Sequence, residues 1–251
     1  MAHACNPSTL GSNGLFQSDE EAAKHVSQSF LYGGKWGAGD VRFENLNNDN
    51  KIDIGDNTLA NPGDRKIIGN STPRFLWGID LNASWKGFDI RAFFQGVMKR
   101  DAWLGGSWGS LEYYFGATNS GEWWATGITA VKDYYRDANT WSVANGYQKA
   151  NQDAFLPRAT FSNKNERCQT RYLMNAAYMR LKNFQAGYTI PRNITTKWGI
   201  SNMRVFVSIE NLFTITKMPK QFDPEMIGTD SRHSNGYPLS KTFSFGINIT
   251  F

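Results

Sequence analysis

The closing segment of the chain, residues 240–251, alternates between large apolar and small polar side chains. Its odd positions from 243 to 251 carry Phe, Phe, Ile, Ile and Phe, whereas the even positions from 242 to 250 carry Thr, Ser, Gly, Asn and Thr. Because successive side chains of a β-strand point to opposite faces, one face of this strand is wholly apolar. The pattern is typical of a strand with hydrocarbon on one side and water on the other. A strand of a soluble β-sandwich can alternate as cleanly, so other segments must decide between the two.

Residues 75–97 show the same alternation twice. The apolar face of this segment carries Phe75, Trp77, Ile79, Leu81 and Trp85 in the first run and Phe88, Ile90 and Phe94 in the second. Lys86-Gly87 between the runs predicts a two-residue hairpin turn, because glycine tolerates the positive φ that such turns demand. The apolar face carries no charged residue, which is expected in a barrel, since a charge facing lipid costs about 2–4 kcal/mol near the bilayer midplane.

Two further strands are predicted, at 178–190 and 203–215. The apolar residues of the first change parity between Leu181 and Phe184, so a β-bulge near Lys182-Asn183 is needed to keep a single apolar face. The connections alternate between short (86–87 and about 191–202) and long (about 98–172 and 216–239), as the two ends of an outer-membrane barrel do. Because five strands alone would leave unpaired edges in lipid, the sequence predicts an all-β fold: the C-terminal antiparallel strands of a larger transmembrane barrel with long extracellular loops.

The composition agrees with this fold class and argues against nucleic-acid binding. The mean hydropathy of −0.50 is too polar for membrane-spanning helices, but barrel strands need only about 9–11 residues, of which every second one is polar. The net charge of +5 is mild and its basic residues are dispersed, which argues against nucleic-acid binding. We find no arrangement of nucleophile, acid and base, so we do not expect an enzyme.

Residues 45–56 have the spacing of a calcium-binding loop. The expected oxygen ligands are Asn45, Asn47, Asp49, the carbonyl of Lys51, Asp53 and Asp56. Asn occupies position 1, Asn50 replaces the usual glycine at position 6, and position 12 is a short Asp. An Asx-rich turn without an ion is the alternative interpretation.

The long segment 98–172 is rich in tryptophan. As candidate platforms for sugar rings we single out Trp103, Trp108, Trp123, Trp124 and Trp141. For any one of them, packing between loops or onto the rim of a barrel is the more common role.

Many short motifs, in order over residues 14–251, resemble the C-terminal region of the SusC/RagA family of TonB-dependent outer-membrane transporters. They are Gly39-Asp40-Val41-Arg42-Phe43, Asp64-Arg65-Lys66-Ile67-Ile68-Gly69-Asn70, Pro73-Arg74-Phe75, Lys86-Gly87-Phe88-Asp89, Phe94-Gln95-Gly96, Leu156-Pro157-Arg158, Tyr178-Met179-Arg180-Leu181-Lys182-Asn183, Gly187-Tyr188-Thr189-Ile190-Pro191, Asn211-Leu212-Phe213-Thr214 and Tyr237-Pro238-Leu239. The resemblance implies import of oligosaccharides or peptides through a barrel of roughly 22 strands in the bacterial outer membrane. It also implies two partners, a SusD-like lipoprotein on the extracellular side and the TonB complex, which would act through an N-terminal part that this chain lacks.

The sequence therefore divides into three parts. We expect residues 1–13 to be an atypical leader of artefactual origin, because the first eleven of them resemble a translated primate interspersed repeat rather than the family. Residues 14–72 are expected to be an extracellular region with the calcium-like loop, and residues 73–251 to hold the barrel strands and loops. The membrane-facing residues are expected to be Phe75, Trp77, Ile79, Leu81, Trp85, Phe88, Ile90, Phe94, Phe243, Phe245, Ile247, Ile249 and Phe251. The alternative function is a soluble, calcium-dependent carbohydrate-binding β-sandwich.

Overall fold

The computed structural model describes residues 2–3, 13–103, 132–160, 162, 164–165, 167–220, 222–227 and 239–251. The strands are β1 (Ala2–His3), β2 (Arg65–Lys66), β3 (Arg74–Trp85), β4 (Phe88–Lys99), β5 (Asp101–Ala102), β6 (Met174–Asn175), β7 (Tyr178–Thr189), β8 (Asn202–Thr216) and β9 (Thr242–Thr250). The helical elements are α1 (Asp19–Lys24), α3 (Trp141–Ala144), α4 (Arg192–Thr195) and the 3-10 helix η2 (Thr196–Trp198).

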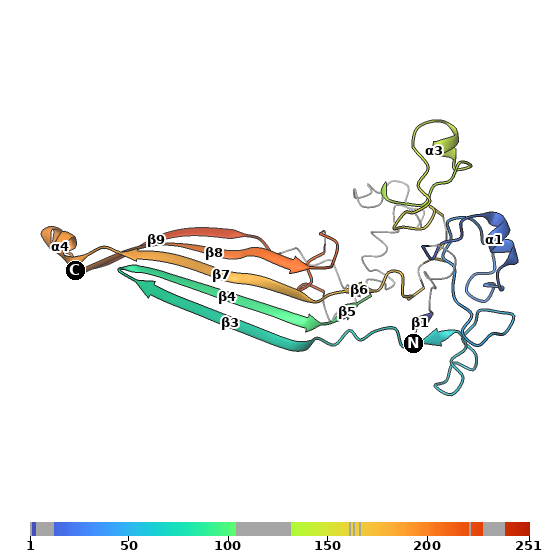
Figure 1. The fold of residues 1–251 in the computed structure, drawn as a ribbon, viewed down its shortest axis with the longest axis horizontal. Helices are drawn as coiled ribbons and strands as arrows, with labels where there is room; N and C mark the ends of the chain where they lie inside the picture. The colour runs from blue at the N-terminus through green and yellow to red at the C-terminus, as the bar shows by residue number, and fades with distance from the viewer. Residues whose placement is uncertain are drawn as a thin grey trace. The chain divides into compact units, whose positions relative to one another are not determined.

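The chain divides into two compact units. Unit 1 comprises Met1–Gly69, Trp103–Leu173 and Gly228–Asn235, and unit 2 comprises Asn70–Ala102, Met174–Ile227 and Gly236–Phe251. Unit 2 holds a five-stranded antiparallel sheet in the order β3-β4-β7-β8-β9, whose strands lie side by side in Figure 1. The predicted antiparallel all-β fold is therefore confirmed, with each long strand at the expected place in the sequence.

The two local irregularities expected from the sequence are both present. Lys86 and Gly87 have φ values of 48° and 88°, the two positive values that a tight hairpin turn of this hand requires. Against β4, Asn183 pairs with Phe93 and Leu181 with Phe94, which leaves Lys182 of β7 as the extra residue of a β-bulge. The bulge restores the parity of the apolar side chains, so one face of the sheet stays apolar along β7.

Register joins the apolar positions of the five strands into continuous rows. One row runs through Trp85, Phe88, Tyr188, Val205 and Ile247, and another through Leu81, Ala92, Phe184, Ile209 and Phe243. Each member is paired directly with the next, so all side chains of a row lie on the same face of the sheet. The separate alternations read from the sequence thus form one apolar surface.

Unit 1 is built mainly from loops around a buried apolar core. Its buried side chains include Leu15, Phe16, Val41, Phe43, Ile52, Tyr135, Leu156 and Tyr172. Isolated bridges such as Leu15–Val41 and Tyr134–Leu156 replace long strands here, and β1 pairs with β2. Among the described residues, no helix has the length and apolar content needed to cross a membrane.

Candidate functional site

The apolar surface of the unit 2 sheet is exposed. Large side chains that expose from about half to most of their area include Phe75, Ile79, Leu81, Trp85, Phe88, Ile90, Phe243, Phe245, Ile247, Ile249 and Phe251, whereas Trp77 and Phe94 are partly covered. Phe245 is 84% exposed in the middle of β9. An apolar surface this extensive is unstable in water and indicates a contact with lipid or with another apolar surface.

The opposite face of the sheet carries the charges, and they are paired. Arg91 of β4 donates to Asp80 of β3, with Nη2 2.6 Å from Oδ2. Arg204 of β8 reaches across β7 to Asp89 of β4, with Nε 2.9 Å from Oδ1. This long reach is possible because Gly187 of β7 leaves room for the guanidinium, which lies where a Cβ would be. The polar face is thus cross-linked by ion pairs that suit a wet environment.

A second group of ion pairs, within unit 2, holds the segment 222–227 against β7. Arg180 of β7 pairs with Asp223 at 2.6 Å and also with Glu225, which in turn accepts from Lys182 at 2.8 Å. Arg180 and Asp223 are almost completely buried. Asp223 also accepts a hydrogen bond from the backbone of Leu239 at 3.2 Å, so its carboxylate contacts the residues that lead into β9. Sequence analysis missed this group, because the partners lie more than 40 positions apart.

The calcium-like loop of unit 1 is closed by a residue outside its expected ligand set. The buried carboxylate of Asp64 accepts hydrogen bonds from the backbone N–H groups of Leu46 and Asp53, at 2.7 and 2.8 Å. Within the loop, Asp49 accepts from the backbone of Lys51 at 2.9 Å, and its own N–H donates to the Asn47 side chain at 3.1 Å. These contacts give the loop the local geometry of successive Asx turns.

The proposed ligands of this loop are only partly brought together. Asn45 donates to the carbonyl of Asp49, and its buried side-chain oxygen has no hydrogen-bond partner among the described residues. Such an orphaned oxygen at position 1 fits a bound cation. Lys51 forms an ion pair with Asp53, and Asp56 instead accepts from Asn61 at 2.9 Å. In the described part of the chain, no three His, Cys, Asp or Glu side chains are grouped closely enough to hold a metal ion.

Within residues 45–56, a positive φ occurs at Asn48, with a value of 60°, and near the end at Gly55, with a value of 53°, but not at Asn50. The sharp turn therefore comes two residues earlier than position 6 of the expected calcium-loop pattern. Asn is among the few residues that adopt the left-handed conformation with little strain, so Asn48 suits this position.

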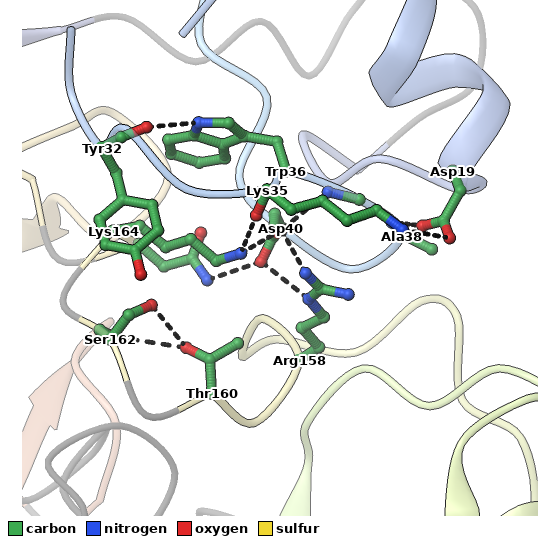
Figure 2. Close-up of polar contacts among 12 residues, drawn as sticks. Asp19, Tyr32, Lys35, Trp36, Ala38, Asp40, Arg158, Thr160, Ser162 and Lys164 are labelled. Carbon is green, nitrogen blue, oxygen red and sulfur yellow. Dashed lines mark hydrogen bonds and ion pairs between the residues drawn. The ribbon is translucent and has the colours of Figure 1, made fainter. Parts of the chain in front are cut away.

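Asp40 is the centre of a buried polar cluster. The sequence motif Gly39–Phe43 contains this residue but did not indicate that it would be buried among charged partners. Figure 2 shows Arg158 and Lys164 both pointing toward its carboxylate. Arg158 forms two hydrogen bonds with it, at 3.0 and 2.9 Å, and Lys164 a third at 2.6 Å. The amide of Asn165 and the N–H of Gly37 donate to the same carboxylate, which is fully buried. Two cations and one anion thus tie residues 37–40 to residues 158–165.

The ammonium of Lys164 has further neighbours. It donates to the carbonyl of Lys35 at 2.9 Å and lies 5.4 Å from the ring centroid of Trp36, at a distance typical of a cation–π contact. Burial lowers the pKa of Lys164, and the hydrogen bond with Asp40 opposes that shift. Loss of Asp40 would leave two cations beside each other in a poorly hydrated site.

A polar cavity of about 440 Å³ lies beside this cluster, between the start of α1 and residues 135–158. Carboxylates, amides and hydroxyls line it, contributed by Gln17, Ser18, Asp19, Glu20, Tyr135, Asp137, Asn139, Thr140 and Gln152, with Ala38, Ala138 and Arg158. The hydrogen bond from the N–H of Ala38 lowers the pKa of Asp19, so this carboxylate is ionised at neutral pH.

The candidate tryptophans are scattered. Trp141 in α3 is exposed and stacks on Tyr147, with ring centroids 5.3 Å apart and planes 20° apart. Trp103 is partly buried and follows β5. Trp108, Trp123 and Trp124 lie outside the described residues.

Comparisons with known proteins agree with the sheet and with the motifs. No protein-family model matches the chain. The chain is 31% identical over 212 residues to TonB-dependent receptor P3 of Formosa agariphila. The aligned region covers 79% of this chain and 18% of that protein. It is 23% identical to TonB-dependent receptor P26 of the same organism, over 77% of this chain and 18% of that protein.

Among solved structures, the RagAB peptide importer in its open-open state matches with a TM-score of 0.58 and 26% identity, over 85% of this chain and 21% of that one. A second structure of the RagAB peptide transporter matches with a TM-score of 0.53 and 26% identity, over 74% and 18%. The chain thus spans about a fifth of the length of these relatives, which are receptors or transporters of the outer membrane. It belongs to the SusC/RagA group of TonB-dependent receptors of the bacterial outer membrane.

Proposed function

We propose that this chain supplies five consecutive strands and an extracellular loop unit to a barrel that imports oligosaccharides or peptides. The observation that carries the proposal is the single apolar face of the five-stranded sheet. The strand register aligns its apolar residues across all five strands, and no charged side chain lies on it. In the proposed arrangement this face contacts the hydrocarbon of the bilayer, and the face with Asp80–Arg91 and Asp89–Arg204 lines the wet interior. The two unpaired edges, β3 and β9, pair with strands of the rest of the barrel.

The membrane part of the proposal has a direct test. The chain is mixed with phosphatidylcholine vesicles from a denatured state, and the vesicles are floated through a density gradient. We expect the chain to float with the lipid and to resist extraction by high salt or carbonate. A chain that stays in the dense fraction as a folded monomer would contradict lipid contact and return the soluble sandwich to consideration.

For the cargo, we propose an oligosaccharide or a short peptide that contacts unit 1. The likeness to a peptide importer supports a peptide, and the exposed Trp141–Tyr147 pair and the polar cavity of unit 1 would suit a sugar. Uptake of labelled oligosaccharides and labelled peptides, compared between cells with the intact gene and cells without it, separates the two. If neither class depends on the gene, the import proposal is wrong.

The proposed partners are a SusD-like lipoprotein, which would dock on the extracellular loops, and the TonB complex, which would engage the remainder of the receptor. Affinity purification of the complete receptor from detergent-solubilised outer membranes tests the first partner. We expect one surface lipoprotein in stoichiometric amount. The TonB complex is tested by collapsing the proton gradient. We expect uptake to be lost, because TonB-linked import requires that gradient as its energy source.

We further propose that the loop 45–56 binds calcium through oxygens of Asn45, Asn47, Asp49, Lys51, Asp53 and Asp56. The buried, unpartnered side-chain oxygen of Asn45 supports this assignment, because desolvation without a partner costs about 1–3 kcal/mol that a cation would recover. The ion would supply a fixed positive charge that draws these oxygens together, and the affinity expected for an extracellular loop of this kind is about 0.1–1 mM.

Calorimetric titration of the chain with calcium tests this site. We expect saturable heat in the wild type and none in Asn45→Ala, whereas Asn193→Ala, at an exposed position of α4, should bind as the wild type does. Equal binding by both variants would place the ion elsewhere. Absence of binding in the wild type would leave the loop as an Asx-rich turn.

A further inference from the structure

At one end of the unit 2 sheet, a pocket of about 430 Å³ lies between the β3–β4 turn and the beginning of the β7–β8 connection. Its lining comes from Lys86, Gly87, residues 189–192 and Asn202. Figure 1 shows α4, which starts in this lining, at the same end of the sheet as the C-terminal end of β9. A backbone hydrogen bond from Thr189 to Gly87, at 2.8 Å, joins the two walls of the pocket.

The pocket is positively charged without compensation. Lys86 and Arg192 line it, and neither forms an ion pair with any residue in the described part of the chain. The segments around it, 84–88 and 190–202, contain Lys86, Arg192 and Lys197 but no Asp or Glu. The nearest acidic residue in sequence, Asp89, is already paired with Arg204. Two of these cations are more than 100 positions apart in sequence, so composition alone shows no cluster here.

The same end of the sheet is where the apolar face stops. The Lys86 ammonium lies 4.8 Å from the ring centroid of Trp85, which is 70% exposed on the apolar face. Phe88 packs on Tyr188 directly beside it, with ring centroids 4.5 Å apart. Beyond the strands, Ile194 and Trp198 expose apolar surface next to the basic residues of α4 and η2. Aromatic rings with adjacent cations are typical of the level at which a protein passes from hydrocarbon to headgroups.

We propose that this pocket binds the phosphate of an anionic phospholipid headgroup at the membrane surface. The proposal rests on the function proposed above, because it requires the apolar face to lie in lipid. A guanidinium presents paired N–H donors that match the oxygens of a phosphate, and an ammonium adds a point charge. With the phosphate between Lys86 and Arg192, the acyl chains of the same lipid would continue along Trp85 and Phe88. Free inorganic phosphate shares the headgroup chemistry but would gain nothing from these rings.

The proposal is tested on the whole chain with three double variants. Lys86→Asn/Arg192→Gln removes both charges and keeps the turn, because Asn-Gly is the preferred pair in such hairpins. Lys24→Gln/Lys149→Gln removes two exposed lysines of unit 1 and is the matched control. Lys86→Arg/Arg192→Lys keeps both charges. Binding of phosphatidylglycerol, phosphatidylcholine and inorganic phosphate is measured by native mass spectrometry in detergent micelles, after flotation has shown whether the chain enters phosphatidylcholine vesicles.

We expect phosphatidylglycerol to bind the wild type, the lysine control and the charge-retaining variant equally. Each cation removed should weaken binding roughly fivefold, so the Lys86→Asn/Arg192→Gln variant should bind about 25-fold more weakly. If the chain enters vesicles but phosphatidylglycerol binds no more tightly than phosphatidylcholine, or the Lys86→Asn/Arg192→Gln variant binds as tightly as the Lys24→Gln/Lys149→Gln control, the headgroup site is refuted while the membrane proposal stands. Inorganic phosphate that binds as tightly as the lipid would refute the lipid as the source. A chain that never enters vesicles removes both proposals.

Discussion

Replacing Phe245 with arginine separates a lipid-facing strand from a water-facing one by the sign of its effect. Phe245 lies in β9, opposite Val207, and 84% of its side chain is exposed. If water covers this face, exchanging an exposed phenylalanine for arginine should leave stability nearly unchanged or improve solubility. If hydrocarbon covers it, the same exchange places a charge in lipid and must be strongly unfavourable.

The expected magnitude follows from the position of Phe245 along the strand. The nine residues of β9 rise about 3.3 Å each and, tilted by about 45°, cover roughly 21 Å of an apolar band that is about 25 Å tall. Phe245 is one residue from the strand centre at Gly246, which is only about 2 Å in depth. Arginine there should therefore carry nearly the full penalty of about 2–4 kcal/mol, a roughly 30- to 1,000-fold fall in the folded, inserted population. Phe251→Arg, beyond the end of the strand, should cost only about 0–1 kcal/mol.

The assay is reversible folding of the complete receptor, in which β3 and β9 have partner strands, into phosphatidylcholine vesicles, followed by tryptophan fluorescence across a urea series. Ser244→Arg is the matched control, because Ser244 is the sequence neighbour on the polar face and pairs with Ser208. We expect Phe245→Arg to be far less stable than Ser244→Arg, with Phe251→Arg between them. Equal stability of Phe245→Arg and Ser244→Arg, or a stabilised Phe245→Arg, would show that this face is not in hydrocarbon.

Three further predictions concern buried charge. Asp40→Asn should destabilise unit 1 by about 3–5 kcal/mol in chemical denaturation, because it leaves Lys164 buried without its anion; Lys164→Met, which leaves Asp40 with Arg158, should cost less. Arg180→Gln should speed hydrogen exchange of residues 222–227 by more than about tenfold, since this segment loses its buried partner. Burial lowers the pKa of His25 from 6.5, so the unfolded state binds a proton more readily; stability should fall as the pH drops through that value, and His25→Gln should flatten this dependence between about pH 8 and pH 5.

The parts of the fold that sequence predicts well are those fixed by neighbours in the chain. Alternation over 243–251 depends only on the two-residue period of a strand, and it placed β9 to within one residue. The turn at Lys86-Gly87 follows from the backbone freedom of glycine. The bulge at Lys182, seen in the pairing of β7 with β4, follows from a parity change between Leu181 and Phe184, which can be read from a few adjacent residues. In each case the cause and the effect lie within one strand or one hairpin.

The contacts that sequence did not reveal join residues that are distant along the chain. Asp40 and Arg158 are 118 positions apart, and Arg180 and Asp223 are 43 apart. Both Asp40 and Arg158 stand in motifs typical of the family, but a single sequence carries no signal that pairs them. The closure of the calcium-like loop by Asp64 was missed for a different reason. A ligand pattern assigns roles to its own positions, and Asp64 lies eight residues beyond the last of them.

The two units bury their apolar residues in opposite ways, and this difference has a physical cause. Unit 1 encloses Leu15, Phe16, Val41 and Phe43 and closes its charges around Asp40, as a domain surrounded by water must. Unit 2 turns its large apolar side chains outward and pairs its charges on the opposite face of the sheet, which is favourable only if hydrocarbon covers the outside. One chain therefore contains a unit whose apolar core suits surrounding water and a sheet whose apolar outer face suits surrounding lipid. Within unit 2 alone, each end of such a strand passes from hydrocarbon to water, and cations such as Lys86 and Arg192 would be stable there beside exposed aromatic rings.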